Sequence, residues 1–178
     1  IGSERLYDLV LRLNASRALG AIRQAISQLG WEDERPIVIN AFNPALGNAL
    51  AGELNESFLA YYCYDEISAA PWIARHGARH EKHFLREADC TIVSSRGLWR
   101  NKAPYANDLA LIQNGVDLSI FQSTGNRPAD LPAGSIIGYI GSVDERLDLE
   151  LLKSVAATFP NTPLVFLGRV VAEGHAQA

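Results

Sequence analysis

Apolar residues recur along the chain in two spacings, one typical of helices and one typical of buried strands. Between Glu4 and Leu29 they return every three or four positions, which predicts an amphipathic helix that ends at Gly30, and a break near Asn14 stays open. Short runs rich in β-branched and aromatic residues predict strands at 37–42, 59–64, 90–94 and 109–112, with helices at 45–56, 71–87 and 96–103 between them. This alternation predicts a parallel sheet wound with crossover helices.

The pattern changes after Val116. Residues 117–134 are rich in glycine, asparagine, proline, aspartate and serine, which is the composition of a linker. A new strand is expected at 135–141, a helix at 147–159 and another strand at 164–168. We therefore expect an α/β protein with two Rossmann-like, doubly wound parallel-sheet lobes. Residues 1–116 belong to the first lobe, 117–134 form an interdomain linker, and 135–178 begin a second lobe that is only partly present.

Composition narrows the class of protein. The chain has 178 residues, of which 48% are hydrophobic and 20% are charged, and no stretch approaches the roughly 18 consecutive apolar residues of a membrane span. Its net charge of −4 gives no general attraction to nucleic acid. We expect the protein to be cytoplasmic. Cys63 and Cys90 lie in apolar runs without metal-binding or redox spacing, so both are predicted to pack in the core.

Ligands of open parallel sheets collect at the carboxyl ends of the strands. The segment 138–146 follows this rule, because its glycines would let the backbone approach a phosphate and Arg146 can pair with two phosphate oxygens. A simple glycine turn with a solvated Arg146 stays open as the alternative.

Two further groups of residues could carry chemistry. Asp65 and Glu66 follow a predicted strand, and a carboxylate there could remove a proton from an attacking hydroxyl, although helix capping or a solvated turn stays open. His76, His80 and His83 share one face of a predicted helix. Because no matched carboxylate accompanies these histidines, we expect a polar face and no metal site.

The order of several weak motifs resembles the retaining glycosyltransferases of the GT-B fold. The motifs are Glu81, Ala88-Asp89, Val93-Ser94-Ser95, residues 112–117 (IQNGVD) with Phe121, and Ile140-Gly141-Ser142. The closest subgroup resembles bacterial cell-surface polysaccharide transferases, of the group 1 or family 4 type. Gln113 departs from the family pattern, which often has proline at that position.

The resemblance implies an enzyme that moves a sugar from a nucleotide diphosphate donor to a sugar or lipid-linked acceptor, without metal or cofactor. It would place Gly141, Ser142, Glu145 and Arg146 beside the donor, and Asp65 with Glu66 at the catalytic position facing the acceptor. The family's glycine-rich first loop would precede residue 1 and its donor-binding glutamate pair would follow residue 178, so the chain is expected to be incomplete at both ends.

Two other functions are compatible with the same sequence. A sugar-nucleotide epimerase of the same fold would need no acceptor, and a non-catalytic α/β binding module would have lost the donor site. Peripheral contact with the inner face of a membrane also stays open, through the basic residues Arg75, Arg79, Lys82 and Arg86, although a solvated helix face is the preferred interpretation of these charges.

Overall fold

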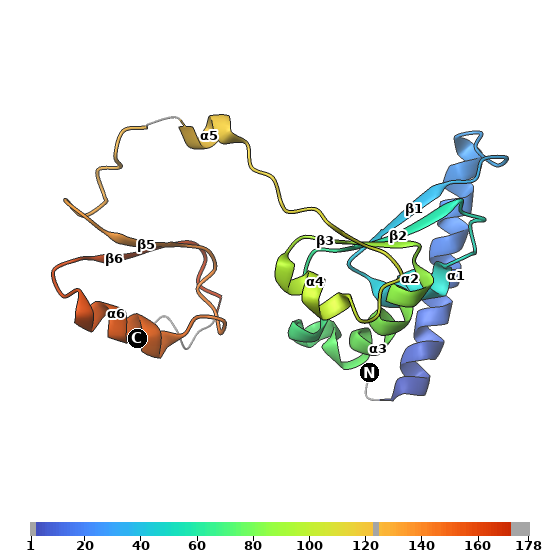
Figure 1. Ribbon diagram of the computed structural model, residues 1–178, viewed down its shortest axis with the longest axis horizontal. Helices are drawn as coiled ribbons and strands as arrows, with labels where there is room; N and C mark the ends of the chain where they lie inside the picture. The colour runs from blue at the N-terminus through green and yellow to red at the C-terminus, as the bar shows by residue number, and fades with distance from the viewer. Residues whose placement is uncertain (1–2, 123–124, 172–178) are drawn as a thin grey trace. The chain divides into compact units, whose positions relative to one another are not determined.

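The computed structural model describes residues 3–122 and 125–171 and divides into two compact units, residues 1–116 and 117–178. Each unit combines a parallel sheet with helices, so the predicted α/β, Rossmann-like class is confirmed (Figure 1). The boundary lies after Val116, where the expected linker begins. The end of the expected second lobe, residues 172–178, lies outside the described residues.

Unit 1 is built on a parallel sheet whose strand order β1-β2-β3-β4 follows the order of the chain. Its strands are β1 (Ile37–Ala41), β2 (Phe58–Cys63), β3 (Cys90–Val93) and β4 (Leu109–Leu111). Ile39 pairs with Ala60, and Tyr62 pairs with Ile92. Each strand lies within about two residues of its predicted bounds, because short apolar runs bounded by turn residues mark buried parallel strands well.

The helices of unit 1 are α1 (Glu4–Gln28), α2 (Pro44–Leu50), α3 (Pro71–Glu87) and α4 (Arg96–Lys102), with a 3₁₀ turn η1 (Ile67–Ala69) before α3. Helix α1 runs without a break at Asn14, and α2 ends sooner than expected, at Leu50. The connecting helices α2, α3 and α4 lie on one side of the sheet (Figure 1). This is the outcome expected when right-handed crossovers join strands in chain order. The reversal of strand order that makes a sheet doubly wound does not occur among the described strands.

The core lies between the sheet and α3. Its buried side chains are Leu59, Tyr61, Cys63, Phe84, Leu85, Ala88, Val93 and Leu98. Gly47 allows α2 to approach closely, because a Cβ there would stand 2.6 Å from the Phe84 ring. The residues that alternate with the core positions point to the opposite face, where Ile37 and Ile39 are 68% and 61% exposed.

Unit 2 contains a two-stranded parallel sheet of β5 (Ile137–Ile140) and β6 (Leu164–Leu167), connected by α6 (Leu149–Thr158). Ile137 pairs with Leu164, and Ile140 pairs with Leu167. A short helix that the sequence analysis did not predict, α5 (Leu118–Gln122), lies in the expected linker and is exposed. Across both units, none of the helices within the described ranges is long and apolar enough to cross a membrane.

Candidate functional site

Polar residues gather where β2, β3 and β4 end. Tyr64, Asp65, Ser94, Ser95 and Asn114 come from the segments that follow these strands, and they line a hollow of about 400 Å³. The side chain of Ser94 donates a hydrogen bond to the Tyr64 carbonyl oxygen over 3.0 Å, which ties two of the segments together. The hollow therefore occupies the edge of the sheet at which ligands of parallel α/β proteins collect.

Asp65 and Glu66 both line this hollow, but they differ in how their carboxylates are used. Asp65 is exposed, and its Oδ1 accepts a hydrogen bond from the Glu66 backbone N–H over 2.9 Å. Glu66 is half-buried and accepts hydrogen bonds from Lys102 at 2.7 Å, Ser68 at 2.9 Å and Asn101 at 3.1 Å. Of the two predicted catalytic carboxylates, Asp65 is the more exposed.

The surroundings of Glu66 also fix its charge. Burial by itself raises the pKa of Glu66, but the hydrogen bonds from Lys102, Asn101 and Ser68 outweigh burial and lower the pKa to about 2. A carboxylate this acidic is a weak proton acceptor. The geometry therefore favours a structural role for Glu66, which holds the amide of Asn101 at the wall of the hollow and pairs with the ammonium group of Lys102.

Lys102 links Glu66, which lines the hollow, to Glu81 in the buried interior. The sequence analysis did not identify Lys102. Its Nζ lies 2.7 Å from Glu66 Oε1 and 2.8 Å from Glu81 Oε2, and its side chain is only 5% exposed. Burial lowers the pKa of Lys102, but its hydrogen bonds to the two glutamates reverse this and leave the pKa raised. Nothing in the local sequence of α4 marks its last residue as buried, so only the tertiary structure identifies this ion-pair cluster.

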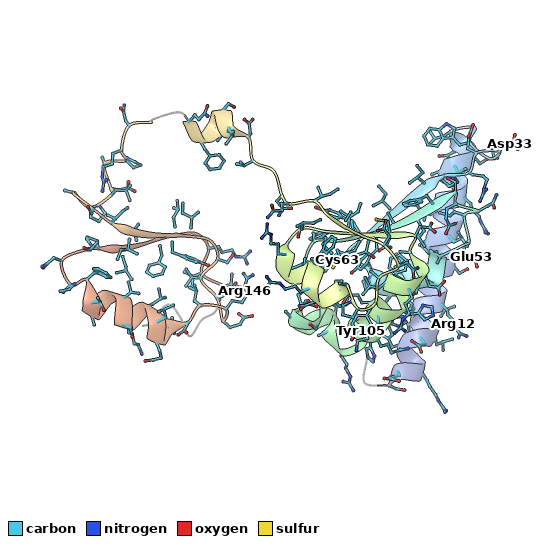
Figure 2. The ribbon with its side chains drawn as sticks, in the orientation of Figure 1. Arg12, Asp33, Glu53, Cys63, Tyr105 and Arg146 are labelled. Atoms are coloured by element: carbon cyan, nitrogen blue, oxygen red, sulfur yellow. The ribbon has the colours of Figure 1, made fainter. Side chains whose placement is uncertain are left out.

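Glu81 accepts further hydrogen bonds from the core. The Tyr61 hydroxyl donates to Glu81 Oε1 over 3.0 Å, and the Cys63 thiol, labelled in Figure 2, lies 3.5 Å from the same oxygen. Burial, the largest cause, raises the pKa of Cys63 to about 12, so the thiol stays protonated. This agrees with the predicted packing role of Cys63. Glu81 is therefore the buried carboxylate that pairs with Lys102.

In unit 2 the predicted donor residues follow the ends of β5 and β6. Gly141 follows β5 and Gly168 follows β6, and their backbones meet so closely that a Cβ on Gly168 would stand 2.0 Å from the Gly141 carbonyl oxygen. Backbone pairing continues past the strands, since the Val143 N–H donates to the Arg169 carbonyl oxygen over 2.9 Å. Gly168 was expected as a strand end, but its contact with Gly141 was not predicted.

Arg146 is held in a fixed orientation by Asp144, a second residue whose role sequence reasoning missed. Nε and Nη2 of Arg146 donate to the two carboxylate oxygens of Asp144 over 2.9 and 2.6 Å, and the hydrogen bond, its largest cause, raises the pKa of Arg146. The Asp144 side chain is 9% exposed and that of Arg146 is 77% exposed. A guanidinium has five N–H donors, so Arg146 can still donate on the side away from Asp144. Glu145, between them, is exposed.

The three histidines of α3 tie helices together. His76 stacks on Tyr7 of α1 with ring centroids 4.2 Å apart, His80 Nε2 lies 3.5 Å from Asp8 Oδ1, and His83 Nδ1 lies 2.9 Å from Asn48 Oδ1. In the part of the chain that the structure describes, no three histidine, cysteine, aspartate or glutamate side chains are grouped so that they could hold a metal ion.

The basic residues of α3 also contact neighbouring side chains. Arg79 forms an ion pair with Asp8 at 2.6 Å, and Lys82 and Arg86 lie over the ring of Tyr105. These contacts join α3 to α1 and to the segment after α4. They reduce the basic surface that α3 could offer to a membrane.

The fold places this chain among the α/β proteins built on parallel sheets, and its two groups of polar residues follow the carboxyl ends of the strands, where ligands of such proteins generally lie. No protein-family model and no curated protein matches the chain.

Proposed function

We propose that this chain belongs to a glycosyltransferase that moves a sugar from a nucleotide diphosphate donor to a hydroxyl acceptor, with unit 2 binding the donor. The observation that carries the proposal is the meeting of Gly141 and Gly168 at the ends of β5 and β6, close in sequence to an arginine whose orientation Asp144 fixes. Side-chain-free backbone lets a diphosphate come close, and a guanidinium pairs with its oxygens. The resemblance of the motif order supplies the reaction class.

In the proposed reaction the bond between the anomeric carbon and the diphosphate oxygen breaks, and a bond from that carbon to the acceptor oxygen forms. The diphosphate leaves with the electron pair and gains negative charge, which Arg146 stabilises. The acceptor hydroxyl loses its proton. We propose that Asp65, an exposed carboxylate in the hollow of unit 1, accepts this proton. Glu66 keeps its side chain on Lys102 and takes no proton in this scheme.

The acceptor is proposed to be a sugar or a lipid-linked sugar that enters the hollow at the end of β2, β3 and β4. Hydroxyl groups suit this hollow, because its lining offers Ser95, Asn101 and Asn114 as hydrogen-bonding partners beside Asp65. Such a transfer would be a step in the biosynthesis of a polysaccharide or glycoconjugate.

The proposal is tested by calorimetric titration of the 178-residue chain with UDP-, GDP- and dTDP-linked sugars. We expect one nucleotide to bind, and Arg146→Ala to weaken that binding by roughly tenfold to a hundredfold, because a hydrogen bond to a charged group contributes about 1.5–3 kcal/mol. Lys153→Ala is the matched control, since Lys153 is an exposed cation of the same unit that pairs with Glu150 at 2.9 Å.

The possible results separate the candidate functions. Binding that Arg146→Ala weakens and Lys153→Ala leaves unchanged supports a donor site. Binding accompanied by exchange of a sugar proton with solvent, and needing no acceptor, would instead favour an epimerase. If no sugar nucleotide binds, the donor-site proposal fails and a non-catalytic α/β module becomes the better interpretation.

A further inference from the structure

Residues 141–143 follow β5, and two of their three carbonyl oxygens lie against the segment that follows β6. The Gly141 carbonyl oxygen lies close to Gly168, since a Cβ added to Gly168 would stand 2.0 Å from it. The Val143 carbonyl oxygen accepts a hydrogen bond from the Val171 N–H over 2.9 Å. The pairing of the two segments therefore turns both carbonyl oxygens towards the protein.

The third carbonyl, that of Ser142, is held by a side chain. Its oxygen accepts a hydrogen bond from the Tyr139 hydroxyl over 2.9 Å. Tyr139 lies in β5 and is half-buried, and its ring packs on that of Phe166 in β6 with the centroids 5.9 Å apart. The same hydroxyl would stand 2.9 Å from a Cβ added to Gly141. Tyr139 therefore lies against the backbone that follows its own strand.

The direction of the Ser142 carbonyl matters at a site for an anion. A carbonyl oxygen carries partial negative charge and repels phosphate oxygens, whereas backbone N–H groups and a guanidinium attract them. A Ser142 carbonyl that was free to turn would be able to face a diphosphate lying between Gly141 and Arg146. The hydrogen bond from Tyr139 opposes this turn, because it keeps the oxygen on the side of the protein.

We propose that Tyr139 is a positioning residue for the nucleotide diphosphate, because its hydroxyl holds the Ser142 carbonyl away from the phosphates. The inference rests on the proposed donor site of unit 2 and adds to it a residue that does not touch the donor. Tyr139 acts through the backbone of Ser142, whereas Arg146 pairs with the phosphate oxygens directly. The tyrosine thus removes a repulsion, and the arginine supplies an attraction.

The first test is calorimetric titration of the full 178-residue chain with the sugar nucleotide that the unchanged chain binds. We expect Tyr139→Phe to weaken binding roughly threefold to tenfold, which is about the effect of losing one neutral hydrogen bond. The phenylalanine keeps the ring and its contact with Phe166, so the variant should fold. Tyr105→Phe is the matched control, since it removes the same hydroxyl from a tyrosine of unit 1, beside Lys82. It should bind like the unchanged chain.

The second test separates positioning from a general loss of stability. Phosphorus NMR of the donor at saturation reports only on molecules that are folded and have the donor bound. In Tyr139→Phe the released Ser142 carbonyl changes the surroundings of the phosphates, so the signals of the bound diphosphate should differ from those in the unchanged chain. Tyr105→Phe should give the same signals as the unchanged chain.

Three results would overturn the inference. If Arg146→Ala weakens donor binding and Tyr139→Phe does not, the donor site stands and Tyr139 has no part in it. If Tyr139→Phe weakens binding but leaves the phosphorus signals of the bound donor unchanged, its role is only structural. If the unchanged chain binds no sugar nucleotide, the donor-site proposal fails and the role of Tyr139 fails with it.

Discussion

At the scale of single residues, the most constrained side chain is Lys102, a cation with two carboxylate partners and almost no exposure to water. Its ion pairs with Glu66 and Glu81 offset the cost of burying three charged groups. Removing Lys102 would take this cation from both carboxylates, whereas removing either glutamate would leave Lys102 with one carboxylate partner. The wall of the hollow beside Asp65 therefore depends on a cluster whose members come from three separate parts of the chain.

The lowered pKa of Glu66 makes the stability of unit 1 depend on pH. The pKa is about 2 in the folded chain and 4.5 in its ordinary state, so the folded state binds fewer protons than the unfolded state between these values. The stabilisation by Glu66 is present above about pH 4.5 and is lost as the pH falls towards 2.

We therefore expect Glu66→Gln to flatten the pH dependence of the free energy of unfolding between pH 4.5 and 2. The measurement is urea unfolding at a series of pH values in that window. Glu150→Gln serves as control, because the Glu150 side chain is 84% exposed and its partner is the surface residue Lys153. An equally steep loss of stability in Glu66→Gln and the unchanged chain would show that other carboxylates carry the effect.

Site residues differed in how far the sequence could identify them. Asp65, Gly141 and Arg146 were found because they follow predicted strands, and the position of a strand end is visible in the local pattern. Lys102 and Asp144 were not found, because their roles come from burial and from partners that the local pattern does not reveal. The catalytic and donor-binding roles themselves stay predictions.

At the scale of elements, the pattern of apolar residues predicted every strand and the long helices, since burial decides both. It missed α5, because a helix of five residues is too short to show the three-and-four spacing of apolar residues that marks a helix. It also suggested a longer α2, whereas the helix ends before Gly52, which takes a positive φ of 79°. Short exposed elements are set by local turn chemistry, which leaves a weaker signal.

The approach of β6 to β5 gives a prediction for the element pair in unit 2. Gly168→Ala should destabilise this unit by roughly 1–3 kcal/mol, because the new Cβ would overlap the Gly141 carbonyl oxygen and the backbone would have to move. Hydrogen exchange of the β5 and β6 amides measures the effect. Gly138→Ala is the control within β5, where an added Cβ has no neighbour within 4 Å. Equal exchange rates in the two variants would contradict the close approach.

At the scale of the whole molecule, the two units are joined by an exposed segment, and this segment should be the first to be cut by a protease. Chymotrypsin cleaves after aromatic residues, and Phe121 in the short helix α5 is 74% exposed. We expect the first cut there, with Phe84 in the core of unit 1 left intact. Mass spectrometry of early fragments identifies the site, and Phe121→Ser should slow the reaction. A first cut within α3 would show that unit 1 opens more easily than the connecting segment.

The order of strands in unit 1 has a consequence for how the protein is made. Strands β2, β3 and β4 are each hydrogen-bonded to the strand that precedes them in the chain, so their pairing partners have already been synthesised when they appear. Contacts between near neighbours in sequence form faster than distant ones, and chains emerge from the ribosome with the N-terminal end first. Unit 1 can therefore add one strand and one helix at a time during synthesis, before the residues of unit 2 have been translated.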